Sequence, residues 1–137
     1  MLMRALDELT LVGGQIQPSD MATLKAEGVT TIVNNRPDEE EPGQPSSLQV
    51  EAAARAAGLD YRHIPVGSSG LSAHQVEAMA AAIEAADGKL LAFCRSGTRS
   101  TYLWALARAR KGDDADEIVR KAAAAGYDLT PVRPYLG

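Results

Sequence analysis

Short apolar runs alternate with longer amphipathic stretches along most of this chain. The runs have the length and the apolar or β-branched content of strands, and they occupy residues 9–12, 29–33, 59–66 and 90–93. The amphipathic stretches open at polar residues, end near glycines, and predict helices at about residues 20–27, 46–57, 72–86, 100–110 and 114–124. Two of these helices begin with capping boxes, Ser46-x-x-Gln49 and Ser72-x-x-Gln75. Residues 127–137 are predicted to form a proline-containing tail.

This alternation predicts an α/β fold. Right-handed crossovers between successive strands favour a single domain over residues 1–137, with a mainly parallel central sheet flanked by helices. Ligands of such sheets bind outside the carboxyl ends of the strands. Loops at residues 34–45, 67–70 and 94–99 follow three predicted strands, so we expect a functional site where these loops meet.

The chain's only cysteine, Cys94, lies in the most informative of these loops. It directly follows the apolar run 90–93 and precedes a predicted helix. The free amide groups and the dipole of a helix N-terminus favour negative charge, and Arg95 and Arg99 add positive charge. A thiolate in such a place is a strong nucleophile. A cysteine that merely closes a buried strand is the plainer interpretation, but the Cys-x4-Arg pattern between strand and helix favours a reactive site.

The same loop has the composition of an oxyanion-binding site. The amides of Arg95, Ser96, Gly97 and Thr98, together with the Arg99 side chain, are predicted to hold phosphate, sulfate or thiosulfate. Gly97 allows the backbone to curl without a Cβ clash. Ser100 is a candidate hydrogen-bond donor to the cysteine sulfur.

The loop at residues 34–45 is polar, acidic and rich in proline. Its acids, residues 38–41, are predicted to be a solvated charge run. Arg36 has two interpretations: it contacts a bound anion, or it holds the loop by pairing with Asp38 or Glu40. Arg36 and Asp38 are therefore the possible site contacts outside the cysteine loop.

Composition restricts the function further. The chain of 137 residues has a formal charge of −4 and few aromatic residues, which argues against nucleic-acid binding. One cysteine excludes an internal disulfide and a resolving thiol, and fits a reducing compartment. Charges at Arg4, Asp7 and Glu8 argue against a signal peptide, and no apolar run approaches a membrane span. We expect a cytoplasmic protein that binds neither membranes nor nucleic acid; its oligomeric state is left open.

No cofactor is expected. His63 and His74 fall on different predicted elements, so they do not suggest a metal site. The expected partner is a small anionic substrate or a phosphorylated molecule.

The chain resembles the family described as β-lactamase hydrolase-like protein, phosphatase-like domain, over about residues 8–111. The resemblance rests on Gly14-Gln15 with Pro18-x-Asp20, Asn35-Arg36-Pro37-Asp38 with Pro42-Gly43-Gln44-Pro45, Ile64-Pro65-Val66, and Cys94-Arg95-Ser96-Gly97-Thr98-Arg99-Ser100. It implies a tyrosine or dual-specificity phosphatase-like fold and a cysteine-dependent phosphatase. In that scheme Cys94 attacks phosphorus, Arg99 and the loop amides bind the equatorial oxygens, and Ser100 eases departure of the thiolate.

Three features depart from the usual phosphatase pattern. Four residues rather than five separate Cys94 from Arg99, Phe93 replaces a histidine, and the loop at residues 67–70 contains no acid to protonate a leaving group. A four-residue loop also resembles that of rhodanese-type sulfurtransferases, in which the cysteine carries a persulfide. Sulfur transfer is therefore the alternative function, and a non-catalytic module that binds anions or phosphopeptides is the second alternative.

Overall fold

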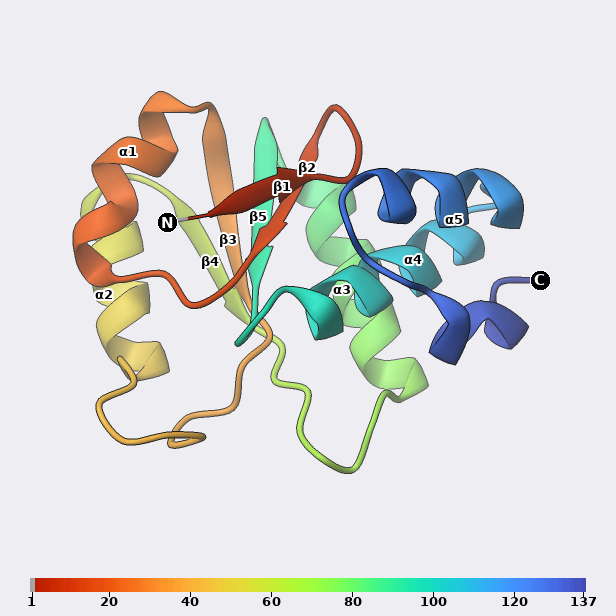
Figure 1. Ribbon diagram of the computed structural model, residues 1–137. Helices are drawn as coiled ribbons and strands as arrows, with labels where there is room; N and C mark the ends of the chain where they lie inside the picture. The colour runs from red at the N-terminus through yellow and green to blue at the C-terminus, as the bar shows by residue number, and fades with distance from the viewer. Residues whose placement is uncertain (1) are drawn as a thin grey trace.

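The computed structural model describes residues 2–137 and contains a five-stranded sheet in the order β1-β2-β5-β3-β4 (Figure 1). The strands are β1 (Met3–Ala5), β2 (Thr10–Gly13), β3 (Val29–Asn34), β4 (Asp60–His63) and β5 (Lys89–Phe93). β1 pairs antiparallel with β2, and the other neighbouring pairs are parallel. The predicted mainly parallel α/β sheet is confirmed.

Helices cover both faces of the sheet (Figure 1). They are η1 (Pro18–Asp20), α1 (Met21–Ala26), α2 (Ser47–Ala56), α3 (Ala73–Ala85), α4 (Thr98–Arg110), α5 (Ala115–Ala124) and η2 (Thr130–Tyr135), where η1 and η2 are 3₁₀-helices. α1 and α2 pack on one face, whereas α3, α4 and α5 lie on the other. Each face therefore has its own apolar core, and β5 contributes alternate side chains to both.

Local signals in the sequence explain where several helices begin. In each predicted capping box the serine Oγ accepts a hydrogen bond from the backbone N–H of the glutamine, at 3.2 Å for Ser46 and 3.4 Å for Ser72. Long, periodic segments with polar caps thus form the elements that their pattern predicts.

The indole of Trp104 joins α4 to the N-terminal hairpin. It is almost fully buried, and its Nε1 donates a hydrogen bond to Asp7 at 3.0 Å.

Two elements differ from the expectation. β1 was not predicted, because its three residues carry no alternating apolar pattern and it forms only by pairing with β2. The tail after Gly126 contains η2, and its Val132 and Leu136 are buried against the core. Both are short segments whose structure depends on distant partners rather than on local periodicity.

The carboxyl ends of β3, β4 and β5 meet at one edge of the sheet. Asn35, the first residue after β3, joins them: its N–H donates to Phe93 O at 2.8 Å, and its side-chain Nδ2 donates to Ile64 O at 2.9 Å. Its own carbonyl accepts from Val66 N at 2.9 Å. The three loops that follow these strands are thereby brought together, as the sequence predicted.

Candidate active site

Cys94 directly follows β5, and its side chain is fully buried. Its N–H donates to Gly13 O at 3.3 Å, which continues the pairing of β5 with β2 past the end of the strand. Its Sγ accepts a hydrogen bond from Gly97 N at 3.1 Å. The sulfur therefore lies where the loop turns into α4, next to amide groups that support negative charge.

Gly97 is the turning point of this loop. Its φ of 92° lies in the left-handed region, and a Cβ at this position would clash with the ring and hydroxyl of Tyr127. The Tyr127 hydroxyl donates to Ser96 O at 3.1 Å, and burial raises the pKa of Tyr127, so it remains a protonated donor at neutral pH. A residue of the C-terminal segment thus fixes the shape of the cysteine loop.

Arg99 projects from the first turn of α4 and is held from two sides. Its Nη1 donates to Val66 O at 2.7 Å, and its two terminal nitrogens form a bidentate pair with Glu40, at 2.6 Å and 2.9 Å. The hydrogen bond to Glu40 raises the pKa of Arg99, burial opposes this increase, and negative charge on Cys94 adds to it. Cys94 and Arg99 flank the same short loop, with Cys94 directly after β5 and Arg99 in the first turn of α4.

Arg36 is 1% exposed and uses its whole guanidinium in the same network. Nε donates to Glu40 at 2.9 Å, Nη2 to Glu41 at 2.8 Å, and Nη1 to Gln15 Oε1 at 2.9 Å. Burial lowers the pKa of Arg36, but the hydrogen bonds to Glu41 and Glu40 outweigh it and the net pKa is raised. Of the two interpretations of Arg36, the structure shows the pairing with acids, with Glu40 and Glu41 as the partners.

Asp38 points to a different part of the molecule. Its Oδ1 accepts from Ser47 N at 2.7 Å, at the first residue of α2. Negative charge is favourable at that position because the helix dipole is positive there. Asp38 therefore holds α2 and is not brought to the cysteine loop with Arg36.

Ser100 is fully buried, and its hydroxyl donates to Asn35 Oδ1 at 2.7 Å. The hydroxyl proton is engaged there, so a hydrogen bond from Ser100 to the Cys94 sulfur requires the hydroxyl to rotate away from Asn35. Asn35 in turn spans the ends of three strands, as described above. This chain of contacts couples the first turn of α4 to the edge of the sheet.

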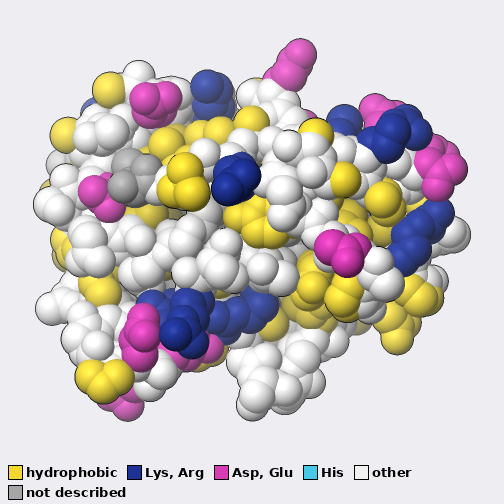
Figure 2. Space-filling model, viewed as in Figure 1, with side chains coloured by type: hydrophobic (Ala, Val, Ile, Leu, Met, Phe, Trp, Pro, Cys, Tyr) yellow, Lys and Arg dark blue, Asp and Glu magenta, His cyan; other side chains and the backbone are white. Residues whose placement is uncertain are grey.

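The remaining side chains of the loop contact one another or the acidic loop. The hydroxyls of Ser96 and Thr98 lie 3.1 Å apart, and Arg95 is mostly exposed, with Nη2 3.8 Å from Glu41. Figure 2 shows Lys and Arg side chains gathered beside carboxylates in the lower part of the face, bordered by an apolar area toward the C-terminal elements. Three arginines, Arg36, Arg95 and Arg99, face two glutamates here, which leaves one positive charge to balance the charge of a Cys94 thiolate.

The acids near the site are ionised at neutral pH. The hydrogen bond from Arg99 lowers the pKa of Glu40 to about 2. Burial alone would raise this pKa, and a second hydrogen bond, from Arg36, also lowers it. The hydrogen bond from Arg36 lowers the pKa of Glu41. Asp38 is engaged as an acceptor at α2, and residues 67–70 carry no acid. None of these groups is placed as a proton donor to a leaving group.

Sequence reasoning missed part or all of the role of three residues that shape the site. Glu40 was predicted either to be solvated or to pair with Arg36; it pairs with Arg36 and also with Arg99, which the sequence did not indicate. Asn35 belongs to the segment that carries the family resemblance, and this was the only signal for its role. Tyr127 lies 33 residues beyond Cys94 in a tail without periodicity, and only the folded chain places it on Ser96.

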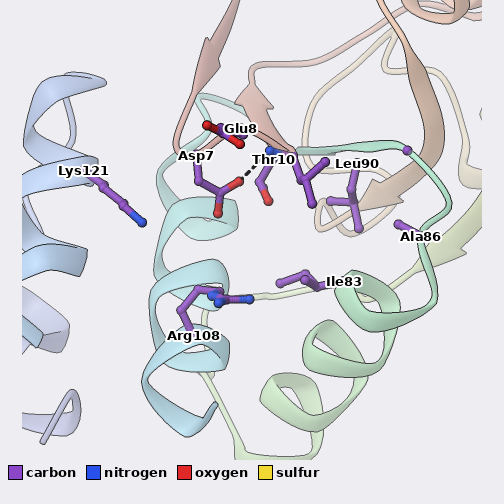
Figure 3. Close-up of a pocket in the computed structure, with 10 residues that line it drawn as sticks. Asp7, Glu8, Thr10, Ile83, Ala86, Leu90, Arg108 and Lys121 are labelled. Atoms are coloured by element: carbon purple, nitrogen blue, oxygen red, sulfur yellow. Dashed lines mark hydrogen bonds between the residues drawn. The ribbon is translucent and has the colours of Figure 1, made fainter. Parts of the chain in front are cut away.

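Other potential sites lie elsewhere. A cavity of about 410 Å³ beside β2 and α4 is lined by Asp7, Arg108 and Lys121 among others (Figure 3). It sits at the amino end of β5, opposite to Cys94. Within residues 2–137, no three histidine, cysteine or acidic side chains gather as a metal site, and no helix is both long and apolar enough to cross a bilayer.

The arrangement of strands and helices places the protein in the tyrosine-phosphatase-like fold class. The structure of Tk-PTP in its active form matches with a TM-score of 0.74, over 98% of this chain and 92% of that one, at 17% identity, which shows the fold alone. A Neisseria meningitidis protein provisionally described as a phosphatase matches with a TM-score of 0.84 and 37% identity, over 99% of this chain and 96% of that one.

The family follows from sequence. Residues 2–111 match the model of the β-lactamase hydrolase-like protein, phosphatase-like domain, and the chain belongs to this family. A β-lactamase hydrolase-like protein of Agrobacterium fabrum is 35% identical over 132 residues, which are 96% of this chain and 31% of that protein. One from Xylella fastidiosa is 36% identical over 90% of this chain and 29% of that protein. The chain thus spans about a third of the length of these curated relatives.

Proposed function

We propose that this phosphatase-like domain is a cysteine-dependent phosphatase whose nucleophile is the Cys94 thiolate. The observation that carries the proposal is the sulfur at the N-terminus of α4, 3.1 Å from the Gly97 amide, with Arg99 in the first turn of the same helix. Membership in a phosphatase-like family supports the same reaction type. The substrate is a small anionic, phosphorylated molecule.

The reaction has two displacement steps. The thiolate attacks phosphorus, an S–P bond forms, and the P–O bond to the organic group breaks with the electron pair leaving on oxygen. The oxygen of water then attacks phosphorus of the phosphocysteine, and the S–P bond breaks with its electron pair returning to sulfur as the thiolate. The proton of the water passes to the phosphate oxygens or to bulk solvent, and phosphate is released. Arg99 and the loop amides of residues 95–98 stabilise the equatorial oxygens in both steps. Ser100 donates to the departing thiolate once it turns from Asn35.

The nearby acids restrict which esters react quickly. Because Glu40 and Glu41 are ionised and paired with arginines, the leaving oxygen departs without a proton from either of them. A missing general acid costs about 10²–10⁴-fold on a poor leaving group. We therefore expect turnover of aryl esters with acidic leaving groups and slow turnover of alkyl esters.

Sulfur transfer is the second candidate, favoured by the four-residue loop and the lack of a placed proton donor. In that reaction the thiolate attacks the outer sulfur of thiosulfate, the S–S bond breaks, and sulfite leaves with the electron pair. The cysteine persulfide then passes its sulfur to an acceptor thiolate. This chemistry requires no general acid, so the ionised state of Glu40 does not oppose it.

One experiment separates the candidates. Reduced protein is exposed to p-nitrophenyl phosphate or to thiosulfate and quenched in acid, and its intact mass is measured by mass spectrometry. The Cys94→Ser variant is treated in the same way as the control. A phosphate adduct with nitrophenol release, both absent from Cys94→Ser, supports the phosphatase. One added sulfur without a phosphate adduct overturns it in favour of sulfur transfer. Neither adduct overturns both and leaves a module that binds anions or phosphopeptides without turnover.

A further inference from the structure

We propose that a pocket next to Arg99 binds the organic group of the substrate, so that the preferred substrates are small phosphate monoesters with an aryl group. The inference rests on the proposed function and specifies its substrate class. The pocket has a volume of about 520 Å³, within the range of small-molecule sites. It lies between the loop that follows β4, the helices α3 and α4, and η2.

The lining of this pocket is apolar except at one end. Apolar and aromatic side chains come from all of the surrounding elements: Val66, Leu71, Val76, Tyr102, Leu106, Val132 and Tyr135. Among the described residues that line it, Arg99 is the single charged one. A ligand that matches this lining carries one negative group at Arg99 and apolar surface beyond it.

Arg99 connects the pocket to the cysteine loop. Its Nη1 donates to Val66 O, and Val66 is itself part of the pocket lining, while Arg99 lies in the first turn of α4, directly after the cysteine loop. A phosphate held by the loop and Arg99 therefore places its organic group beside the apolar wall. Figure 2 shows this continuity, because an apolar area begins where the cluster of basic side chains ends.

The neighbouring cavities do not fit the same ligand. The cavity on the other side of the loop is polar and is lined by Arg4, Gln15, Ser96 and Tyr127 among others. The cavity in Figure 3 is far from Cys94, and several of its lining residues are charged. Of these three cavities, all lined by residues within 2–137, the pocket at Arg99 is the one that combines an apolar wall with a residue of the anion-binding loop. Its volume suits one ring system rather than a folded partner.

The test measures binding separately from turnover. Titration calorimetry on Cys94→Ser compares 1-naphthyl phosphate with methyl phosphate. We expect about tenfold or more tighter binding of the naphthyl ester, because its rings bury apolar surface in the pocket. Adding Leu106→Ser or Tyr135→Ser should bring the two affinities within about threefold of each other. Tyr135 is 74% exposed, so its variant should fold normally even if Leu106→Ser does not.

Leu48→Ser is the matched control, since Leu48 is 76% exposed on α2 and outside the pocket. Its naphthyl preference should equal that of the parent Cys94→Ser protein. Equal binding of both esters, no binding of either, or a preference that survives both pocket substitutions overturns the pocket assignment. If the preference holds but wild-type protein forms no phosphocysteine with p-nitrophenyl phosphate, the pocket stands and the phosphatase proposal fails.

Discussion

Glu40 shows how a single residue can link the two loops of the site. Its carboxylate accepts hydrogen bonds from Arg36, in the loop after β3, and from Arg99, in the first turn of α4. These two arginines are 63 positions apart in the chain. The acid neutralises part of the charge on both arginines and holds Arg99 in a fixed orientation. A guanidinium oriented in advance loses less conformational entropy when it binds an anion.

The lowered pKa of Glu40 predicts a pH dependence of stability. A carboxyl whose pKa falls from 4.5 to about 2 on folding stabilises the native state fully above pH 4.5, and this contribution is lost as the pH falls toward 2. Glu40→Gln should lower the free energy of unfolding by about 1–2 kcal/mol at pH 7, allowing for solvent screening, with a smaller difference at pH 3. Urea unfolding at both pH values measures this. Glu39→Gln is the control, and an equal loss at pH 3 and pH 7 would contradict the assignment.

Gly97 is the residue whose substitution should damage the cysteine loop most directly. Gly97→Ala combines a strained positive φ with a clash against Tyr127, whereas Gly112 has a similar φ of 100° and open space around it. Gly112→Ala should cost about 1 kcal/mol, and Gly97→Ala at least 1–2 kcal/mol more, with loss of phosphocysteine formation. Thermal unfolding and intact mass report the two effects. Equal destabilisation by the two substitutions would show that Tyr127 does not restrict the loop.

At the scale of elements, the loop between β3 and α2 has two separate functions. Its glutamates face the arginines of the site, while Asp38 accepts from the first amide of α2. Sequence reasoning treated Asp38 as a possible site contact, because a loop at the end of a strand does not reveal which side chains turn toward the site. The direction of each side chain is set by the path of the loop.

Asp38→Ala therefore serves to separate a helix-capping role from a catalytic one. We expect a loss of about 0.5–2 kcal/mol of stability, because the N-terminus of α2 loses an acceptor. Asp114→Ala should cost a similar amount, since Asp114 caps α5 at 3.1 Å far from the loops of the site. Turnover of p-nitrophenyl phosphate should fall less than tenfold in either variant. A drop of 100-fold or more in Asp38→Ala alone would make Asp38 the general acid.

At the scale of the whole molecule, the C-terminal segment completes the site. It runs from α5 across α4, buries Leu129, Val132 and Leu136, and places Tyr127 on the cysteine loop. The fold thus uses residues from both ends of the described chain to position a loop at the centre of the sheet. It follows that a change at Tyr127, which does not line the proposed substrate pocket, should affect the reactivity of Cys94 through the shape of the loop.

Tyr127→Phe isolates this effect, because it removes only the hydroxyl that donates to Ser96 O. We expect about 1 kcal/mol less stability and a several-fold slower formation of the phosphocysteine. Thr130→Ser is the control, since Thr130 is exposed in the same segment, lies outside the proposed substrate pocket, and keeps its hydroxyl as serine. Rapid-quench mass spectrometry gives the rate of adduct formation. An unchanged rate in Tyr127→Phe would mean that the loop keeps its shape without this contact.

The sequence by itself determined the α/β class, the succession of the major strands and helices along the chain, and the place of Cys94 between a buried strand and a helix. These features depend on apolar periodicity, capping residues and glycines, which act over a few neighbouring positions. Only the tertiary structure decided that Glu40 bridges two arginines, that Asp38 turns to α2, that Ser100 donates to Asn35, and that Tyr127 reaches the loop. The contacts of Glu40 with Arg99, Ser100 with Asn35 and Tyr127 with Ser96 join residues far apart in the chain, which meet through the pairing of β3 with β5 and the packing of the C-terminal segment. The path of the loop after β3 sets the direction of Asp38, and no periodic pattern encodes it.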